Sequence, residues 1–226
     1  MPPGRDPTSM PQWVDLSQPF DADAPHGPLP PPEFEQLRDV ERDGANVQWY
    51  GAATHVGTHV DAPRHFVPDG DTISDLSVDR FAGEGVVLDL ARDEPAAIDA
   101  EALAAADGRV REGDVVLIRT GWGQRYKEDG YERYPWLDAS AADWLLEREP
   151  KLVGVDTRSP DRPRAMRPER WDAYPVHRQL LPAGTLIAEH LRIPASLAGE
   201  RCEVFGFPVH LRGGDGAPAR FVARRE

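Results

Sequence analysis

Four side chains that commonly bind metal ions or transfer protons lie close together in the first third of the chain. His55, His59, Asp61 and His65 follow the pattern His-x3-His-x-Asp-x3-His. Three imidazoles and a carboxylate form a ligand set suited to zinc or manganese, with one group left over for acid–base work. The segment therefore predicts the divalent metal centre of a hydrolase.

The backbone that carries these residues must be extended but interrupted. β-branched residues alternate from Thr54 to Val60, and Pro63 follows, so a strand is favoured over a helix and would place the four side chains on one face. At about 3.3 Å per residue, His55 and His59 would then lie roughly 13 Å apart, too far for both to make metal bonds of about 2 Å. We therefore expect the chain to bend at Gly57, a residue that tolerates unusual backbone angles.

The second half of the chain offers two further candidates. His177 lies in a short helix predicted to begin after Pro175 and to stop at Gly184. The next segment, 185–189, reads as a strand that ends in the carboxylate of Glu189. A helix followed by a returning strand can bring His177 and Glu189 together although twelve positions separate them.

The motif also resembles a known family. His-x-Gly-Thr-His-x-Asp-x-Pro-x-His, which begins at His55, is similar to the signature of the cyclase-like metal-dependent hydrolases, the family of bacterial kynurenine formamidase and isatin hydrolase. Weaker similarities occur in the same order along the chain, at residues 14–17, 118–122, 152–157 and 215–220.

This resemblance implies a site and a fold. It implies a first metal ion bound by His55, His59 and Asp61, with Asp61 bridging to a second ion held by His177 and Glu189, and with His65 as the catalytic histidine. One or two ions of zinc or manganese are expected, since ligand type alone does not separate the two metals. The implied fold is α/β, a swivelling β/β/α domain built on a mixed sheet, assembled as a homodimer or homotetramer.

The implied chemistry is hydrolysis of an amide, formamide or cyclic amide C–N bond in a small molecule. The metal would polarise the carbonyl and acidify water, and His65 would transfer protons. Kynurenine formamidases tend to carry an aromatic residue before Pro-Gly after the first strand, where this chain has Ala24-Pro25-His26-Gly27-Pro28. The stacking partner for an aryl substrate is thus missing or supplied elsewhere.

Two alternative functions stay open. The family includes members linked to cyclisation or dehydration, so a cyclase or dehydratase acting on a small carbonyl compound is one. A metal-stabilised binding or assembly protein without turnover is the other. The presence of His65 argues against the second, because a purely structural metal site has no use for an extra histidine beside its ligands.

Composition narrows the class of protein. A chain of 226 residues is most simply one domain, 1–226, with the proline-rich residues 1–12 expected to be loose. A net charge of −13 opposes binding to nucleic acids. No run of about 18 apolar residues or signal peptide is visible, so we expect a cytoplasmic protein without a membrane span. The single cysteine, Cys202, cannot form an internal disulfide and reads as a small buried residue.

Hydrophobic patterning predicts strands alternating with helices, which favours the α/β class. The predicted strands cover residues 86–90, 115–119, 152–156, 186–189, 203–209 and 219–223. The predicted helices cover residues 33–41, 100–106 with Asp99 as N-cap, and 139–148.

Two other segments each allow more than one interpretation. Residues 157–174 contain five arginines and form either a lid suited to a carboxylate substrate or a solvated loop. The aromatic residues between 122 and 136 form either a pocket wall or partner surface, or ordinary packing, which is the commoner case.

Overall fold

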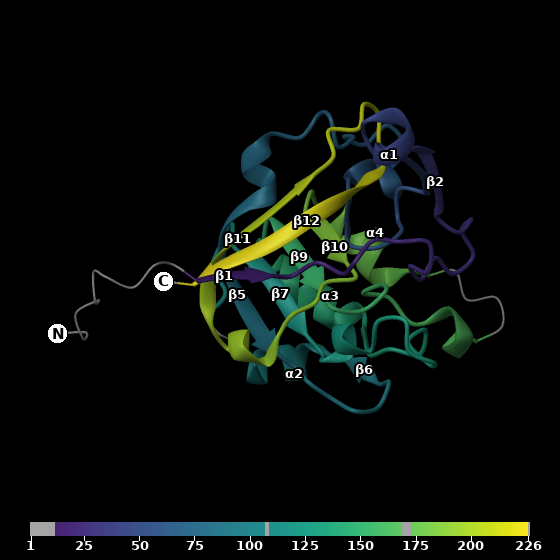
Figure 1. Cartoon of the computed structure of the whole chain (residues 1–226). Coiled ribbons are helices and arrows are strands. Elements are labelled where there is room, and N and C mark those ends of the chain that lie inside the picture. Colours follow the sequence, from purple (N-terminus) through teal and green to yellow (C-terminus); the bar gives the residue numbers. More distant parts are fainter. Residues whose placement is uncertain (1–11, 107–108, 169–172, 226) are drawn as a thin grey trace.

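The computed structural model describes residues 12–106, 109–168 and 173–225, and its centre is one mixed sheet (Figure 1). Within these residues eight strands join in the order β1-β12-β11-β5-β7-β9-β10-β4, and β4 also pairs with β12. This last pairing closes the sheet into a barrel-like ring, with β1 attached outside it on β12. The strands are β1 (Gln12–Asp15), β4 (His59–Asp61), β5 (Ala82–Asp89), β7 (Val115–Arg119), β9 (Leu152–Val155), β10 (Leu186–Glu189), β11 (Arg201–Pro208) and β12 (Gly216–Arg225).

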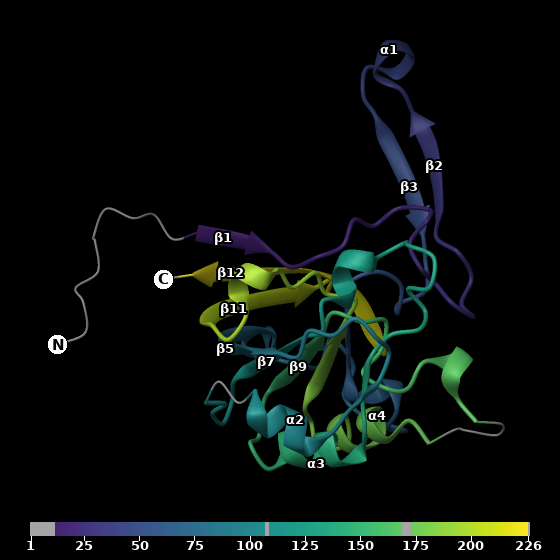
Figure 2. The same cartoon turned by 90° about the horizontal axis from the view of Figure 1, so that it is seen from below.

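Strand direction divides the ring into two parts. β5, β7, β9 and β10 are parallel neighbours, whereas the pairings of β4, β11, β12 and β1 are antiparallel. The parallel strands alternate with helices, as the α/β prediction requires. These helices are α2 (Ala100–Ala105), α3 (Ala139–Leu146) and α4 (Pro175–Leu180), and they lie together on one side of the sheet in Figure 2.

Each face of the parallel strands packs against a separate hydrophobic core. Val87, Leu117 and Ala188 belong to the cluster on the side away from the helices. Their neighbours in sequence, such as Val116 and Ile187, belong to the cluster that α2, α3 and α4 cover. Strands buried on both faces read as continuous apolar runs, which is why the sequence pattern located them. β7 and β10 have the predicted bounds, and the others differ by a few residues at their ends.

Aspartate residues cap the starts of helices α2 and α3, and of these two caps only Asp99 was predicted from the sequence. The Asp99 carboxylate accepts a hydrogen bond from the backbone N–H of Ala102 at the start of α2, and Asp138 does the same for Ala141 in α3. The remaining short elements are β6 (Ala97–Ile98), which pairs with β8 (Trp136–Leu137), and the 3-10 helices η1 (Pro63–His65), η2 (Val78–Phe81), η3 (Trp122–Arg125), η4 (Arg164–Met166) and η5 (Ala195–Leu197).

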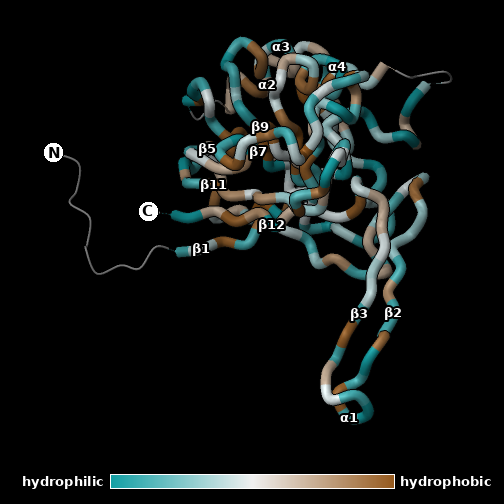
Figure 3. The backbone as a smooth tube through the Cα atoms, turned by 90° about the horizontal axis from the view of Figure 1, so that it is seen from above, coloured by the Kyte–Doolittle hydropathy of each residue, from teal (hydrophilic) through white to brown (hydrophobic). Residues whose placement is uncertain are grey.

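The helix predicted over residues 33–41 is wrong. Residues Glu33–Arg38 form strand β2, which pairs with β3 (Val47–Gly51), and only Val40–Asp43 at the tip forms a helix, α1. Phe34 of β2 stacks on Tyr50 of β3, with ring centroids 6.0 Å apart, so cross-strand packing overrides local helix propensity. Figures 2 and 3 show this hairpin projecting from the body of the molecule.

Three further expectations concern the N-terminal segment, the single cysteine and the absence of a membrane span. The loose segment predicted for residues 1–12 falls mostly on residues 1–11, which lie outside the described part, and Gln12 already belongs to β1. Cys202 is buried in the core as predicted, and burial raises the pKa of its thiol to about 11. None of the helices in the described ranges is long and apolar enough to cross a membrane.

Candidate metal centre

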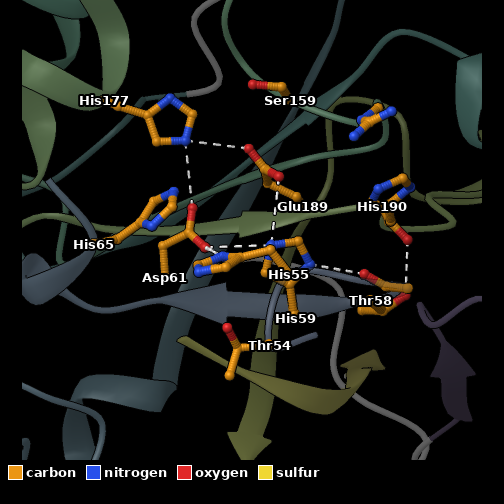
Figure 4. Close-up of polar contacts among 12 residues, drawn as sticks. Thr54, His55, Thr58, His59, Asp61, His65, Ser159, His177, Glu189 and His190 are labelled. Atoms are coloured by element: carbon orange, nitrogen blue, oxygen red, sulfur yellow. Dashed lines mark hydrogen bonds and ion pairs between the residues drawn. The ribbon is translucent and has the colours of Figure 1, made fainter. Parts of the chain in front are cut away.

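Two neighbouring strands place three site residues on one face. Antiparallel pairing sets Glu189 of β10 opposite His59 of β4, and Ile187 opposite Asp61. Opposed residues share a face, so His59, Asp61 and Glu189 lie on the side of Ile187, which is the side covered by the helices. His59 Nε2 lies 3.2 Å from Asp61 Oδ1 and 3.4 Å from Glu189 Oε2 (Figure 4).

Helix α4 brings His177 to the same point. Its Nε2 lies 3.4 Å from Asp61 Oδ2 and 3.3 Å from Glu189 Oε1. The residues from the two halves of the chain that were expected to converge thus meet at one point of the fold. The helix begins at Pro175, where the prediction had it begin after this residue, and it ends at Leu180, short of Gly184, which has a φ of 85°.

Asp161 holds His177 in this orientation. Its carboxylate accepts hydrogen bonds from the backbone N–H groups of Val176 and His177, and its Oδ2 lies 2.5 Å from His177 Nδ1. A carboxylate on the second ring nitrogen is a common way to orient a metal-binding histidine. Asp161 was not predicted as a site residue, because its only signal in the sequence was an acidic residue in an arginine-rich loop.

His55 reaches the cluster through the expected bend. Gly57 has a φ of 69°, and the ring centroids of His55 and His59 are 5.2 Å apart. His55 Nδ1 lies 2.7 Å from Asp61 Oδ1, and its Nε2 lies 2.9 Å from Asp215 Oδ2. Asp215 is a second missed site residue, since the sequence placed it only in a weak family match at residues 215–220.

His65 lies beside His55, although not on a strand face. The expectation of one continuous strand face is wrong beyond Asp61, because β4 ends there and Pro63 starts the 3-10 helix η1, which contains His65. The two imidazole rings stack with centroids 3.9 Å apart, and His65 Nδ1 lies 3.5 Å from Asp215 Oδ2. Burial lowers the pKa of His65 below its ordinary value.

The buried carboxylates of the cluster favour a positive charge beside them. Among the described residues, buried polar atoms without a hydrogen-bond partner include His59 Nε2, Asp61 Oδ2 and Glu189 Oε1. Burial disfavours a charged His59, but the carboxylates of Asp61 and Glu189 outweigh burial and raise its pKa to about 10. Burial is likewise outweighed at His55, whose pKa rises to about 9 beside Asp61 and Asp215.

A divalent cation fits this arrangement. Imidazole and carboxylate atoms are the donors that zinc and manganese accept, and a cation would satisfy atoms that lie near oppositely charged groups but make no hydrogen bond. Two groups of side chains have candidate ligand atoms within 4.8 Å of one another, namely His55, Asp61 and His65, and His59, Asp61 and Glu189. Asp61 belongs to both groups, as a bridging ligand would. The first group includes His65, so geometry alone does not separate its ligand role from a catalytic one.

A cavity of about 1350 Å³ opens over this cluster. His55, His65, His177 and Glu189 lie in its lining, and so do residues 22–29. Three aromatic residues, Phe66, Tyr134 and Tyr174, also line this cavity.

The arginine-rich loop and the aromatic segment, which each had two possible interpretations, differ in their relation to the cavity. Arg158, Ser159, Arg164, Arg167 and Tyr174 of the arginine-rich loop line the cavity, whereas residues 169–172 of that loop lie outside the described part. Of the aromatic residues between 122 and 136, only Tyr134 is in the lining. Trp122, Tyr131 and Tyr134 form a buried cluster, so packing explains most of that segment.

His190, next to Glu189, was also missed. It is buried with a φ of 56°, and its Nδ1 lies 2.8 Å from the Tyr131 hydroxyl. Its backbone carbonyl accepts a hydrogen bond from Thr58 Oγ1, as Figure 4 shows. The bond with Thr58 ties the end of β10 to the loop that precedes β4, and the bond with Tyr131 ties it to the loop after η3.

Comparison with known proteins agrees with this geometry. A family model described as "Putative cyclase" matches residues 14–162. The chain belongs to the cyclase family. Kynurenine formamidase from Geobacillus thermodenitrificans is 30% identical to this cyclase-family chain over 219 residues, covering 96% of this chain and 99% of that protein.

Solved structures show the same fold. Isatin hydrolase A from Ralstonia solanacearum has a TM-score of 0.86 and 25% identity, covering 96% of this chain and 92% of that chain. A structure titled as a potential metal-dependent hydrolase with cyclase activity has a TM-score of 0.79 and 25% identity, covering 96% of this chain and all of that one. The swivelling α/β domain expected from the sequence is therefore confirmed.

Proposed function

We propose that this cyclase-family chain is a metal-dependent hydrolase that cleaves the C–N bond of a small amide, formamide or cyclic amide. The observation that carries the proposal is the buried cluster of His59, Asp61, Glu189 and His177, with unpartnered polar atoms, beneath an open cavity. The names of two relatives, kynurenine formamidase and isatin hydrolase A, support the same bond type.

The proposed ligands are His55, His59, Asp61, His177 and Glu189. A bound divalent ion, zinc or manganese, would act as a Lewis acid that polarises the substrate carbonyl and makes water easier to deprotonate. The protein's own contribution is to hold the ligands rigidly. β4 and β10 fix three of them by strand pairing, and Asp161 fixes the ring of His177.

His65 is the proposed acid–base group. It lies in the cavity lining, next to His55, and can therefore reach both water and substrate. In hydrolysis of a formamide, the oxygen of water bonds to the formyl carbon and the C–N bond breaks. His65 would take the proton from water and return it to the leaving nitrogen, so that formate and an amine are released.

Metal content and turnover measured on one preparation test the proposal. The purified protein should contain zinc or manganese and should hydrolyse one or more of N-formylkynurenine, isatin and small cyclic amides. A chelator should abolish turnover, and the added metal should restore it. The Asp61→Ala variant should lose most of its metal, because a shared carboxylate is removed.

The other outcomes separate the alternatives. A metal-loaded protein that hydrolyses none of these compounds would contradict the proposal and favour a binding or assembly role. Formation of a ring or loss of water from a small carbonyl compound, without C–N hydrolysis, would favour a cyclase or dehydratase.

A further inference from the structure

Arg158 lies in the wall of the cavity that contains the candidate metal centre. The exposed fraction of its side chain is 18%, and Ser159, which follows it, lines the same cavity beside Glu189 and His177 (Figure 4). The guanidinium also packs directly over Gly27, another residue of the lining, where an added Cβ would lie only 1.9 Å from Nη1. Arg158 is thus held in place at the boundary of the substrate space.

The hydrogen bonds that Arg158 makes within the protein leave some of its N–H donors available to a ligand. Nη1 donates to Glu132 Oε2 at 2.6 Å, and Nη2 donates to the His26 carbonyl at 3.3 Å. A guanidinium has five N–H donors, so these two bonds to described residues do not use them all. Glu132 is the more exposed partner, at 47% of its side chain, and also lines the cavity.

The charges around Arg158 favour a singly charged anion. Burial alone would lower the pKa of Arg158, but Glu132, Tyr134 and Glu189 outweigh burial and raise it, so the group is fully charged. Arg164 and Arg167 lie further along the same lining. The acidic residues of the lining, Asp23 and Glu132 among them, oppose a ligand with two negative charges such as a phosphate monoester.

We propose that Arg158 selects substrates that carry a carboxylate, which it binds while the amide lies at the metal centre. A planar guanidinium matches the two oxygens of a carboxylate, and the aromatic residues Phe66, Tyr134 and Tyr174 suit the apolar body of an aryl or similar substrate. The inference rests on the proposed amide hydrolysis, and it adds the substrate class and the residue that recognises it.

Two matched aryl formamides provide the test. 2-Formamidobenzoate carries a carboxylate, and formanilide is its neutral counterpart. kcat/KM for both should be measured on the metal-loaded wild type and on Arg158→Gln, Glu132→Gln and the double variant. Arg224→Gln is the control, because Arg224 forms a similar ion pair with Glu203 on strands β11 and β12, outside the cavity.

We expect the ratio of kcat/KM for the charged over the neutral substrate to fall about tenfold or more in Arg158→Gln, the factor that corresponds to about 1.4 kcal/mol. The Glu132→Gln change should raise this ratio, because it removes a competing carboxylate. The ratio in the double variant should stay low. The control should leave it unchanged.

Two results would overturn the inference while leaving the proposed hydrolase intact. One is an equal loss on both substrates in Arg158→Gln, which indicates only a structural role. The other is a wild-type ratio in the double variant, which means that the unpaired charge of Glu132 caused the loss.

Ligand binding tests Arg158 even if neither formamide is hydrolysed. Calorimetry with benzoate and benzamide on the same metal-loaded proteins requires no turnover. Arg158→Gln should weaken benzoate binding about tenfold while changing benzamide much less. Equal effects on the two compounds would reject carboxylate selection, whereas absent hydrolysis by the wild type would reject the proposed function.

Discussion

His65 lies on the 3-10 helix η1, whereas His59, Asp61, Glu189 and His177 lie on β4, β10 and α4. Its ring contacts His55 and Asp215, whereas the cluster of His59, Asp61, Glu189 and His177 assembles without it. A cation held by that cluster does not need His65. A proton-transfer role for His65 is therefore separable from metal binding by experiment.

We predict that His65→Ala retains its metal and its fold but loses activity by roughly 10²-fold or more, the scale of a general acid–base contribution. Metal content and turnover should be determined on the same sample. His210→Ala, at an exposed histidine beyond β11, is the matched control. Metal loss in parallel with activity would reassign His65 as a ligand.

A second residue-scale prediction concerns Asp156, which is fully buried. It accepts hydrogen bonds from the backbone N–H groups of Thr120 and Gly121 and from the Thr120 hydroxyl. Burial outweighs these bonds and raises the pKa of Asp156 to about 6 from an ordinary 3.8. Between these pH values the folded protein binds the proton more tightly than the unfolded chain, so this group lowers the free energy of unfolding as pH rises.

Asp156→Asn removes this titration. The variant should be less stable than wild type at pH 4.5, because an amide offers one acceptor oxygen where the carboxyl group has two. Its deficit should shrink by about 2 kcal/mol on going to pH 7.5. Urea unfolding of both proteins at the two pH values measures the difference. A deficit that is independent of pH would show that Asp156 titrates normally.

At the scale of elements, the site depends on a turn that joins His55 to β4. Gly57 is at its centre, with a φ of 69°, and a Cβ there would lie 2.7 Å from Cδ2 of Phe20. The turn therefore requires glycine for two reasons, its backbone angle and the close approach of an aromatic ring.

We predict that Gly57→Ala lowers both metal content and stability, because it displaces His55 relative to His59. The backbone strain alone costs about 1–2 kcal/mol, and the clash with Phe20 adds to it. Gly44→Ala is a matched control, since Gly44 has a φ of 77° and nothing lies within 4 Å of its added Cβ. Equal stability losses with full metal content in both variants would contradict a special role for the turn.

Sequence patterns correctly predicted the helices and strands that depend on residues close together in the sequence. The apolar runs of β7 and β10 and the Asp99 cap of α2 depend on neighbours within a few positions. The hairpin was missed because its pairing is driven by contacts across strands, such as that of Phe34 with Tyr50.

The same distinction holds within the site. The motif from His55 to His65 is contiguous and could be recognised directly in the sequence. Asp161 and Asp215 lie in loops, and the histidines that they contact are distant from them in the sequence. Asp215 lies 160 positions from His55. Only the closed sheet, which pairs β12 with β4, brings these two together.

At the scale of the whole molecule, the hairpin of β2 and β3 packs on the body through Phe20, which contacts Phe34 and Tyr50. Figure 3 shows it extending away from the body and carrying hydrophobic segments. Leu37, Val40, Trp49 and Tyr50 are all exposed. An isolated two-stranded hairpin is only marginally stable in water, so this arm is expected to pack against another surface.

We propose that a second copy of the chain supplies that surface, consistent with the homodimer or homotetramer implied by the family resemblance. Exposed apolar side chains on such an arm mark an interaction site. The double variant Val40→Glu, Trp49→Glu places charges on the arm and should convert the assembly to monomers, as measured by light scattering during size-exclusion chromatography. Val78→Glu, at an exposed residue of η2 with 72% of its surface accessible, should leave the assembly intact.

A wild-type chain that is monomeric at micromolar concentration would reject the proposal. A dimer that persists in the double variant would move the interface away from the arm.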